Sequence, residues 1–344
     1  MAKSPSKSPS PPRDQADPIE PDEPLAVDEN ADGDSTYGSI ASSSASLTSS
    51  ILKFRQENGR QYHAYKPERD YILPSDEQES ERLDLQHHVF YLTFDNKLFT
   101  CPAGKDGKPL KRVLDAGTGT GIWAVDFGDE YPEAHVTGVD LSPIQPSFVP
   151  PNVAFYVDDL EEPWAYDRPF DLIYGRMLTG ALTNWPQFIS RCFDNLAPGG
   201  WLELDDILFP AASDDNTLLP DSSLAKWNEH VIKAGHLLNH SITSAKYYKQ
   251  QMIDAGFVNV TEKVYKWPIN PWPKDPKYKE IGVWTEENFC GGIFGLSVAL
   301  FTRALGWTAE ELEVFLVDVR KDLRDRGVHA YWPIYVVYGQ KAEE

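Results

Sequence analysis

A glycine-rich turn between two carboxylates constrains the fold of this chain more than any other stretch. A short apolar run ending at Leu114 leads into the turn, which consists of Gly117, Thr118, Gly119, Thr120 and Gly121. Glycine allows the backbone to turn tightly and lets a ligand lie against it without a Cβ in the way. The pattern predicts a strand that turns into a helix, whose first free N–H groups face the ligand.

The acidic residue that follows the next predicted strand indicates what kind of ligand this is. Residues 135–139 are predicted as the second strand, and Asp140 and Leu141 come directly after it. A carboxylate at this strand end can accept hydrogen bonds from both hydroxyls of a ribose. The spacing therefore fits a nucleoside cofactor.

Asp115, before the first glycine, narrows the choice of nucleoside. The turn has the spacing G-x-G-x-G, whereas the dinucleotide fingerprint is G-x-G-x-x-G with an apolar residue before it. A carboxylate at Asp115 would repel a pyrophosphate but could hold a positively charged amino-acid portion. S-adenosylmethionine has that portion, so it is the predicted cofactor. The alternative is a loop that only turns tightly.

The sequence resembles the class I S-adenosylmethionine-dependent methyltransferases, and within them the fungal LaeA-like group, from about Gly59 to the C-terminus. The resemblance rests on LDAGTGTGIWAVDFGDEYP, GVDLSPIQPSFVPPNVAFYVDDLEEPW, FDLIYGRMLTG, LAPGGWLELDD and HAYWPIYVVYGQK. It implies an α/β, Rossmann-like fold with a seven-stranded, mostly parallel sheet. The last strand, predicted at 331–338, would insert antiparallel beside the fifth, at 201–204, and form a reversed C-terminal hairpin.

The same resemblance implies further contacts to cofactor and acceptor. Asp158 or Asp159, at the end of a third predicted strand, would meet the adenine amino group; the alternative is a solvated turn. Tyr174, where relatives often carry His, and Arg176 are expected at the cofactor. Met177 and Leu178 follow in a loop at the carboxyl edge of the sheet, where open α/β sheets bind their ligands, and are expected to line the acceptor site.

The domain organisation follows from changes in composition. Residues 1–50 are rich in Ser and Pro with scattered acidic residues and are predicted to be a disordered tail. Residues 51–344 are expected to form one methyltransferase domain with a cofactor-binding core at 110–207 and an N-terminal helix from about Ser75 to Phe94. The aromatic insertion at 267–307 is predicted to be a helical lid. Tyr62, by resemblance, and Trp272 and Trp284 of the lid are the candidate acceptor contacts; packing in the core is the alternative.

Catalytic residues are only weakly marked, because methyl transfer can rely on positioning alone. If a general base exists, the candidates near the carboxyl edge are His87, His88, Asp205 and Asp206. His236 and His240 share a helical face, but no third ligand accompanies them, so no metal site is expected.

The composition limits the partners and the compartment. A net charge of -21 and an isoelectric point near 4.7 argue against a nucleic-acid partner, although a basic protein tail remains possible. Nothing at the N-terminus resembles a signal peptide, no apolar run approaches the length of a membrane span, and the three cysteines form no C-x-x-C pair. We expect an intracellular protein, cytoplasmic or nuclear, without a membrane partner.

Three functions fit the sequence. The first is an enzyme that methylates a small molecule, in particular a fungal secondary metabolite. The second is a nuclear regulator of the LaeA type that acts through protein partners or histone methylation. The third is a methyltransferase fold that keeps the cofactor but does not transfer the methyl group; the intact glycine turn and Asp140 count against it.

Overall fold

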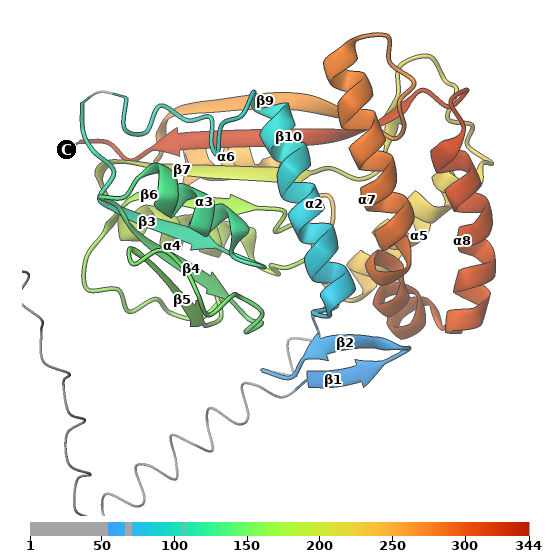
Figure 1. Ribbon diagram of the computed structural model, residues 1–344, viewed down its shortest axis with the longest axis horizontal. Helices are drawn as coiled ribbons and strands as arrows, with labels where there is room; N and C mark the ends of the chain where they lie inside the picture. Colours follow the sequence, from blue (N-terminus) through green and yellow to red (C-terminus); the bar gives the residue numbers. More distant parts are fainter. Residues whose placement is uncertain (1–53, 66–70, 106, 344) are drawn as a thin grey trace, which may run out of the picture. The chain divides into compact units, whose positions relative to one another are not determined.

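A twisted eight-stranded sheet forms the centre of the protein (Figure 1). The computed structural model describes residues 54–65, 71–105 and 107–343, so the predicted tail lies outside the described residues. Five parallel strands lie in the order β5-β4-β3-β6-β7. Their bounds are β3 Arg112–Ala116, β4 His135–Asp140, β5 Val153–Val157, β6 Phe170–Arg176 and β7 Leu196–Ile207.

The last strand confirms the reversed hairpin. β10 (Ala330–Gln340) runs antiparallel between β7 and β9 (Val258–Pro268). The sheet has eight strands, whereas seven were predicted. The additional strand is β8 (Ala212–Ser213), which pairs with β10 beyond the point where the pairing of β7 with β10 ends at Ile207. The α/β, Rossmann-like architecture is as predicted, and the extra strand is a two-residue continuation of the fifth.

Alternating side chains along the strands pack into two separate layers of helices. Val113 and Leu172 face one layer, and Leu114 and Ile173, their neighbours in sequence, face the other. The first face packs against α2 (Glu77–Thr93), α3 (Ile122–Glu130) and α7 (Pro276–Leu300), and the second against α4 (Trp185–Asn195) and α6 (Tyr248–Asp254). Both faces of the parallel strands are therefore buried, as such sheets require.

Three helices form a bundle beyond the ends of the parallel strands. α5 (Ser223–Leu237), α7 and α8 (Ala309–Arg324) pack against one another, and α7 continues as a π-helix at Phe301–Leu305. α8 begins with a capping box. The Thr308 side chain accepts the Glu311 N–H, and the Glu311 side chain accepts the Thr308 N–H. The N-terminal hairpin consists of β1 (Phe54–Glu57) and β2 (Arg60–His63) and lies near the N-terminal end of α2 (Figure 1).

The helix at Pro276–Leu305 corrects one expectation from the sequence. It is long and apolar enough to cross a membrane by length and composition, with a mean hydropathy of 1.3, although no such run was expected. In this fold 61% of its apolar window is buried inside the protein, against α2, α5 and α8. Its apolar character is therefore accounted for by its place in the core.

α2 is fixed to α7 by a buried arginine, which pairs with a glutamate of α2 and donates to an asparagine of α7. Arg82 donates two hydrogen bonds to Glu79, at 2.7 and 3.0 Å, and a third of 3.0 Å to Asn288 Oδ1 on α7. Gly292 makes room for it, because a Cβ at this position would overlap the Arg82 side chain. This contact sets the distance between α2 and α7, and the cavity described next lies between them and the sheet.

Candidate functional site

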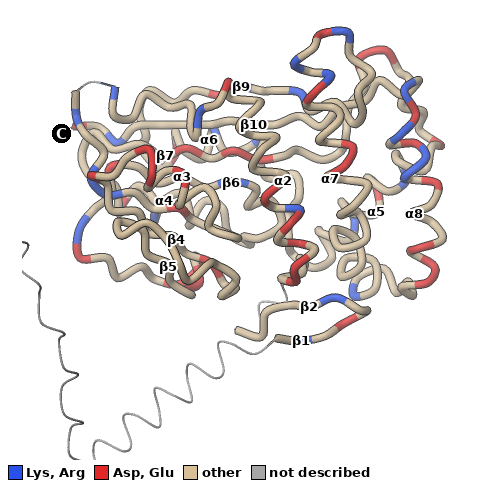
Figure 2. Tube along the Cα trace, viewed as in Figure 1, with Lys and Arg blue, Asp and Glu red and all other residues tan. Residues whose placement is uncertain are grey.

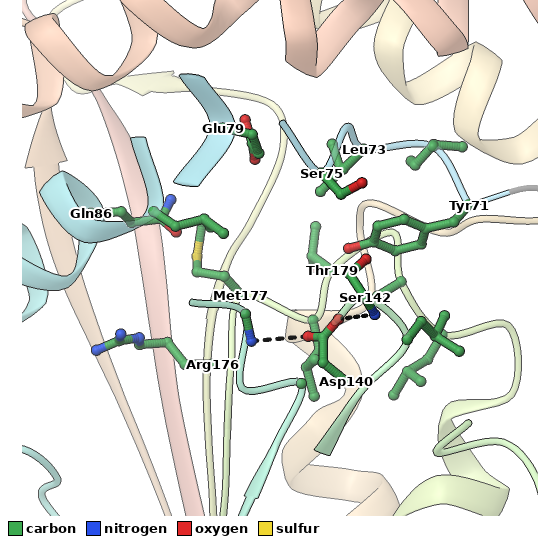
Figure 3. Close-up of a pocket in the computed structure, with 18 of the residues that line it drawn as sticks. Tyr71, Leu73, Ser75, Glu79, Gln86, Asp140, Ser142, Arg176, Met177 and Thr179 are labelled. Atoms are coloured by element: carbon green, nitrogen blue, oxygen red, sulfur yellow. Dashed lines mark hydrogen bonds between the residues drawn. The ribbon is translucent and has the colours of Figure 1, made fainter. Parts of the chain in front are cut away.

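A cavity opens at the carboxyl ends of the parallel strands, between those ends and helices α2, α5 and α7 (Figure 3). β4 lies on one side of β3 and β6 on the other, so this edge contains the topological switch point at which open α/β sheets bind ligands. The predicted cofactor residues that line the cavity are Asp115, Gly117, Thr118, Gly119, Thr120, Asp140, Leu141, Asp158, Asp159 and Arg176. We call this wall the polar half of the cavity.

The glycine turn forms the floor of the polar half. Gly117, Gly119 and Gly121 all have positive φ, at 74°, 57° and 81°. The N–H groups of Gly117 and Thr118 both donate to the Val139 carbonyl at 2.9 Å, which fixes the turn against the end of β4. A Cβ on Gly117 would overlap the Leu178 side chain, so both the backbone conformation and the space require glycine.

Asp140 joins the turn to the loop after β4. Its Oδ2 accepts the Gly119 N–H and its Oδ1 accepts the Ser142 N–H, each at 2.9 Å (Figure 3). Burial raises the pKa of this carboxyl to about 6, although the backbone N–H groups of Ser142, Gly119 and Leu141 act to lower it. Each carboxylate oxygen has a further lone pair, so Asp140 can still accept hydrogen bonds from a ligand.

Asp115 and Arg176 bring opposite charges to one end of the cavity. Asp115 is buried at the end of β3, where it accepts a hydrogen bond from Thr118 Oγ1. Burial raises its pKa to about 6, while the Thr118 hydroxyl and the Arg176 charge act to lower it. An ammonium group beside Asp115 and a carboxylate beside Arg176 would both be compensated, which suits a zwitterionic amino-acid portion.

The two adjacent aspartates after β5 differ in their surroundings. Asp159 is buried and its Oδ1 accepts the Glu161 N–H at 2.9 Å, so it holds the turn. Asp158 is exposed, and its Oδ1 accepts only the neighbouring Asp159 N–H among the bonds found in the described residues. Of the two, Asp158 has more capacity left for an adenine amino group.

The opposite wall of the cavity is mainly apolar, and we call it the apolar half. Its side chains come from α5, α7 and the segments beside them: Ile207, Phe209, Trp227, Val231, Ile242, Phe289, Leu296 and Leu300. Met177 and Leu178, predicted from the sequence, also line the cavity, and the Leu178 side chain packs against Gly117. Met177 has φ 54°, a strained conformation for a residue other than glycine, and its N–H donates to the Asp205 carbonyl at 2.9 Å.

α2 supplies a polar strip along the top of the cavity. Glu79, Arg82 and Gln86 are spaced at three and four residues, so they share one face of the helix. Gln86 is buried, lines the cavity, and has no hydrogen-bond partner among the residues described. Figure 3 shows it on the side of the cavity away from Tyr71.

Of the four predicted catalytic candidates, only Asp206 lines the cavity in the described structure. Its carboxylate accepts the Thr179 N–H and the Tyr248 hydroxyl, at 3.1 and 2.8 Å, and burial raises its pKa to about 7. Asp205 is buried behind the cavity, and His88 lies edge-on to Trp284. His87 has both ring nitrogens within hydrogen-bond distance of other side chains.

Five other predicted site residues lie outside the cavity. Tyr174 stacks on Trp123, with ring centroids 4.2 Å apart, and donates to Asp205 Oδ2 at 2.8 Å; Gly121 packs against Phe155. Tyr62 is buried under Arg303, and Trp272 donates to the Ala330 carbonyl at 2.9 Å. Trp284 is on the exposed face of α7. The insertion does reach the cavity, but through α7 residues on its opposite face.

The sequence analysis missed the residues of the apolar half. Phe289, Leu296 and Leu300 recur at helical spacing, which is the only signal they give. The same spacing is typical of a helix that packs in a core, so the pattern does not distinguish a ligand wall from packing.

Similarity to known proteins covers most of the chain. Residues 85–262 match the methyltransferase domain family. Methyltransferase pytC of Aspergillus terreus is 40% identical, over 87% of this chain and 92% of its own length. Secondary metabolism regulator LAE1 of Cochliobolus heterostrophus is 36% identical, over 84% of this chain and 95% of its own length. Protein-methionine methyltransferase laeA of Emericella nidulans is 34% identical, over 84% of this chain and 77% of its own length.

Proposed function

The chain belongs to the methyltransferase domain family, and from this premise we propose that it transfers the methyl group of S-adenosylmethionine to a small, largely apolar molecule. The observation that carries the proposal is the composition of the cavity. One half holds carboxylates and the glycine turn, and the other half is a wall of aromatic and aliphatic side chains. A polar, charged cofactor and an apolar acceptor would each meet a matching surface.

The residues of the polar half fit S-adenosylmethionine. Asp140 would accept hydrogen bonds from the ribose hydroxyls, Asp115 and Arg176 would compensate the charges of the amino-acid portion, and Asp158 would accept from the adenine amino group. Gly117 has a positive φ and lets Leu178 pack against the turn, where a Cβ would overlap that side chain. When bound, S-adenosylmethionine supplies a methyl group activated by a sulfonium charge.

The residues of the apolar half would hold the acceptor and exclude water. Phe289 and Trp227 are buried and face the cavity from two different helices. Holding the reacting groups in a fixed geometry can supply most of the catalysis of a transfer reaction. Asp206, with a pKa of about 7, can take up a proton from the acceptor near neutral pH.

The distribution of charge supports a ligand without phosphates. Lys and Arg are interspersed with Asp and Glu along α8 and the first half of α7 (Figure 2). With a net charge of -21 over the whole chain, there is little electrostatic attraction for a nucleic acid or an anionic membrane.

A second candidate function is methylation of a protein, within a regulator of secondary metabolism. The names of the relatives LAE1 and laeA favour it, and the negative charge could attract a basic protein segment. In this case the polar half would act in the same way and the acceptor would be a side chain that enters the cavity.

The two candidates can be separated with methyl-labelled S-adenosylmethionine. The purified chain is incubated with label and either a fungal culture extract or mixed histones, and organic-soluble and protein-bound label are counted separately. We expect label in the organic phase, and its loss with Asp140→Ala. Label in protein and never in the organic phase would support the second function, and label in neither would support a fold that does not transfer methyl groups.

A further inference from the structure

His87 on α2 connects two other elements of the cofactor-binding core. Its Nε2 lies 2.9 Å from Asp126 Oδ2 on α3, and its Nδ1 lies 3.0 Å from Arg176 Nη2 at the end of β6. A guanidinium can only donate, so Nδ1 must accept, and Nε2 then carries the proton and donates to Asp126. The two partners together fix the ring as one neutral tautomer.

The surroundings of His87 favour this neutral state. His87 is 6% exposed, and burial is the largest cause that lowers its pKa from the ordinary value. The charge of Arg176 lowers it further. Asp126 on α3 and Asp84 on α2 act in the opposite direction. Tyr91, one turn further along α2, stacks on the imidazole.

Arg176 is held at one place and has donors to spare. Its guanidinium lies over the Phe90 ring, 4.9 Å from the centroid, and its bond to His87 uses one of five N–H groups. It lines the cavity near Asp115, whose pKa it lowers. Figure 3 shows it on the same side of the cavity as Gln86.

We infer that His87, oriented by Asp126, is a positioning residue that aims the Arg176 guanidinium at the carboxylate of the cofactor's amino-acid portion. The inference rests on the proposed function, because it needs S-adenosylmethionine in the polar half. It explains why a histidine at a plausible catalytic position has both nitrogens engaged and lies outside the cavity lining.

The competing role for His87 is to attach α2 to α3. In that case the Asp126 bond matters and the Arg176 bond does not. Asp84 already links α2 to the glycine turn, by accepting the Thr120 hydroxyl at 2.7 Å, so α2 has a second attachment to the core.

Two substitutions separate the roles. His87→Asn places an amide oxygen near Nδ1, where it can accept from Arg176, and cannot reach Asp126. His87→Gln places an amide group near Nε2, where it can donate to Asp126, and leaves Arg176 without its acceptor. Calorimetric titration uses two probes: S-adenosylhomocysteine, which has the carboxylate, and 5′-methylthioadenosine, which lacks the amino-acid portion.

We expect His87→Asn to keep the dissociation constant of S-adenosylhomocysteine within about threefold of wild type and His87→Gln to raise it about tenfold, the loss of one charge-assisted contact. Neither variant should change binding of 5′-methylthioadenosine. Substitutions of the buried His87 could disturb folding, so a variant of its half-exposed partner Asp126 is added. Asp126→Ala is expected to weaken binding of S-adenosylhomocysteine about threefold and to leave binding of 5′-methylthioadenosine unchanged.

The reverse ranking, with Asn weaker than Gln, would overturn the inference and support attachment of α2. An equal loss for both probes would also overturn it. If the wild-type chain binds neither probe, the proposed function fails and the inference fails with it, whereas a failure of the ranking alone leaves the proposed function standing.

Discussion

The two halves of the cavity are built from the sequence in different ways. The polar half is mostly local: Asp115, the glycine turn and Asp140 all belong to one strand-turn-helix-strand unit. The apolar half is assembled from α5, α7 and the segment after β7, which lie far apart in the chain. A function that depends on local backbone geometry leaves a readable motif, whereas a wall made by tertiary packing leaves only apolar periodicity.

The two halves also differ in how they affect the stability of the fold. The polar half buries Asp115 and half-buries Asp140, and their pKa values rise to about 6 because their charged forms lose hydration. The apolar half buries side chains that gain from leaving water. We therefore expect substitutions in the polar half to affect binding more than stability, and substitutions in the apolar half to affect both.

The largest expected effect is that of Asp140→Ala. Removing the carboxylate takes away its charge-assisted hydrogen bonds to the ribose, so S-adenosylhomocysteine should bind about 100-fold more weakly. Calorimetry measures this, and the thermal unfolding midpoint should change little. An unchanged affinity would show that the ribose is held elsewhere and would remove the distinction between the halves.

Leu300→Ala tests whether the apolar half holds the acceptor. Truncation of this buried side chain should lower methyl transfer about tenfold and leave S-adenosylhomocysteine binding within about twofold. Leu316→Ala on α8 is the matched control, since it is as buried but does not line the cavity. Both should lose about 2–5 kcal/mol of stability. Equal activity of the two variants would mean that the wall is only core.

The difference between the two halves also explains which site residues could be predicted from the sequence. The strand ends at Asp115 and Asp140 were located from sequence, because each side chain has a fixed place relative to a glycine turn or a strand. Trp272 and Trp284 were misplaced, because the sequence does not show which face of α7 and its preceding loop meets the cavity. Tyr174 was expected at the cofactor by resemblance, but its ring stacks on Trp123 and its hydroxyl bonds Asp205.

The fold was predictable for a related reason. Parallel strands with buried faces give apolar runs, and the reversed hairpin follows from the family pattern, so β7 and β10 pair as expected. The eighth strand was missed because β8 has only two residues and its pairing depends on β10. Short elements whose stability comes from a distant partner have no signature of their own.

Asp140→Asn tests whether the charge of the polar half lowers the stability of the fold. The folded-state pKa of this carboxyl is raised from 3.8 to about 6, so its contribution to stability is present below 3.8 and is lost as the pH rises through 6. The amide does not ionise and avoids that loss, although one of the N–H groups of Gly119 and Ser142 loses its acceptor at every pH. Relative to wild type, the unfolding free energy of the variant should therefore be about 2–3 kcal/mol higher at pH 8 than at pH 4. Chemical denaturation at both pH values measures this. A gain that is the same at both would mean that charge burial is not its cause.

The smallest expected effect is that of Trp284→Ala. This side chain is 36% exposed on α7 and contacts His88 edge-on, outside the cavity. Methyl transfer and cofactor affinity should both stay within about twofold of wild type. A selective loss of methyl transfer would place the acceptor on the outer face of α7 and contradict the apolar half as its site.

The most direct test of the two-halves account is a crystal structure of the chain with S-adenosylhomocysteine. We predict that the ribose hydroxyls lie within hydrogen-bond distance of Asp140, that the carboxylate contacts Arg176, and that the sulfur faces the apolar half between Met177 and Leu178. An adenosyl group bound against Trp227 and Phe289, with Asp140 free of the ribose, would contradict the account.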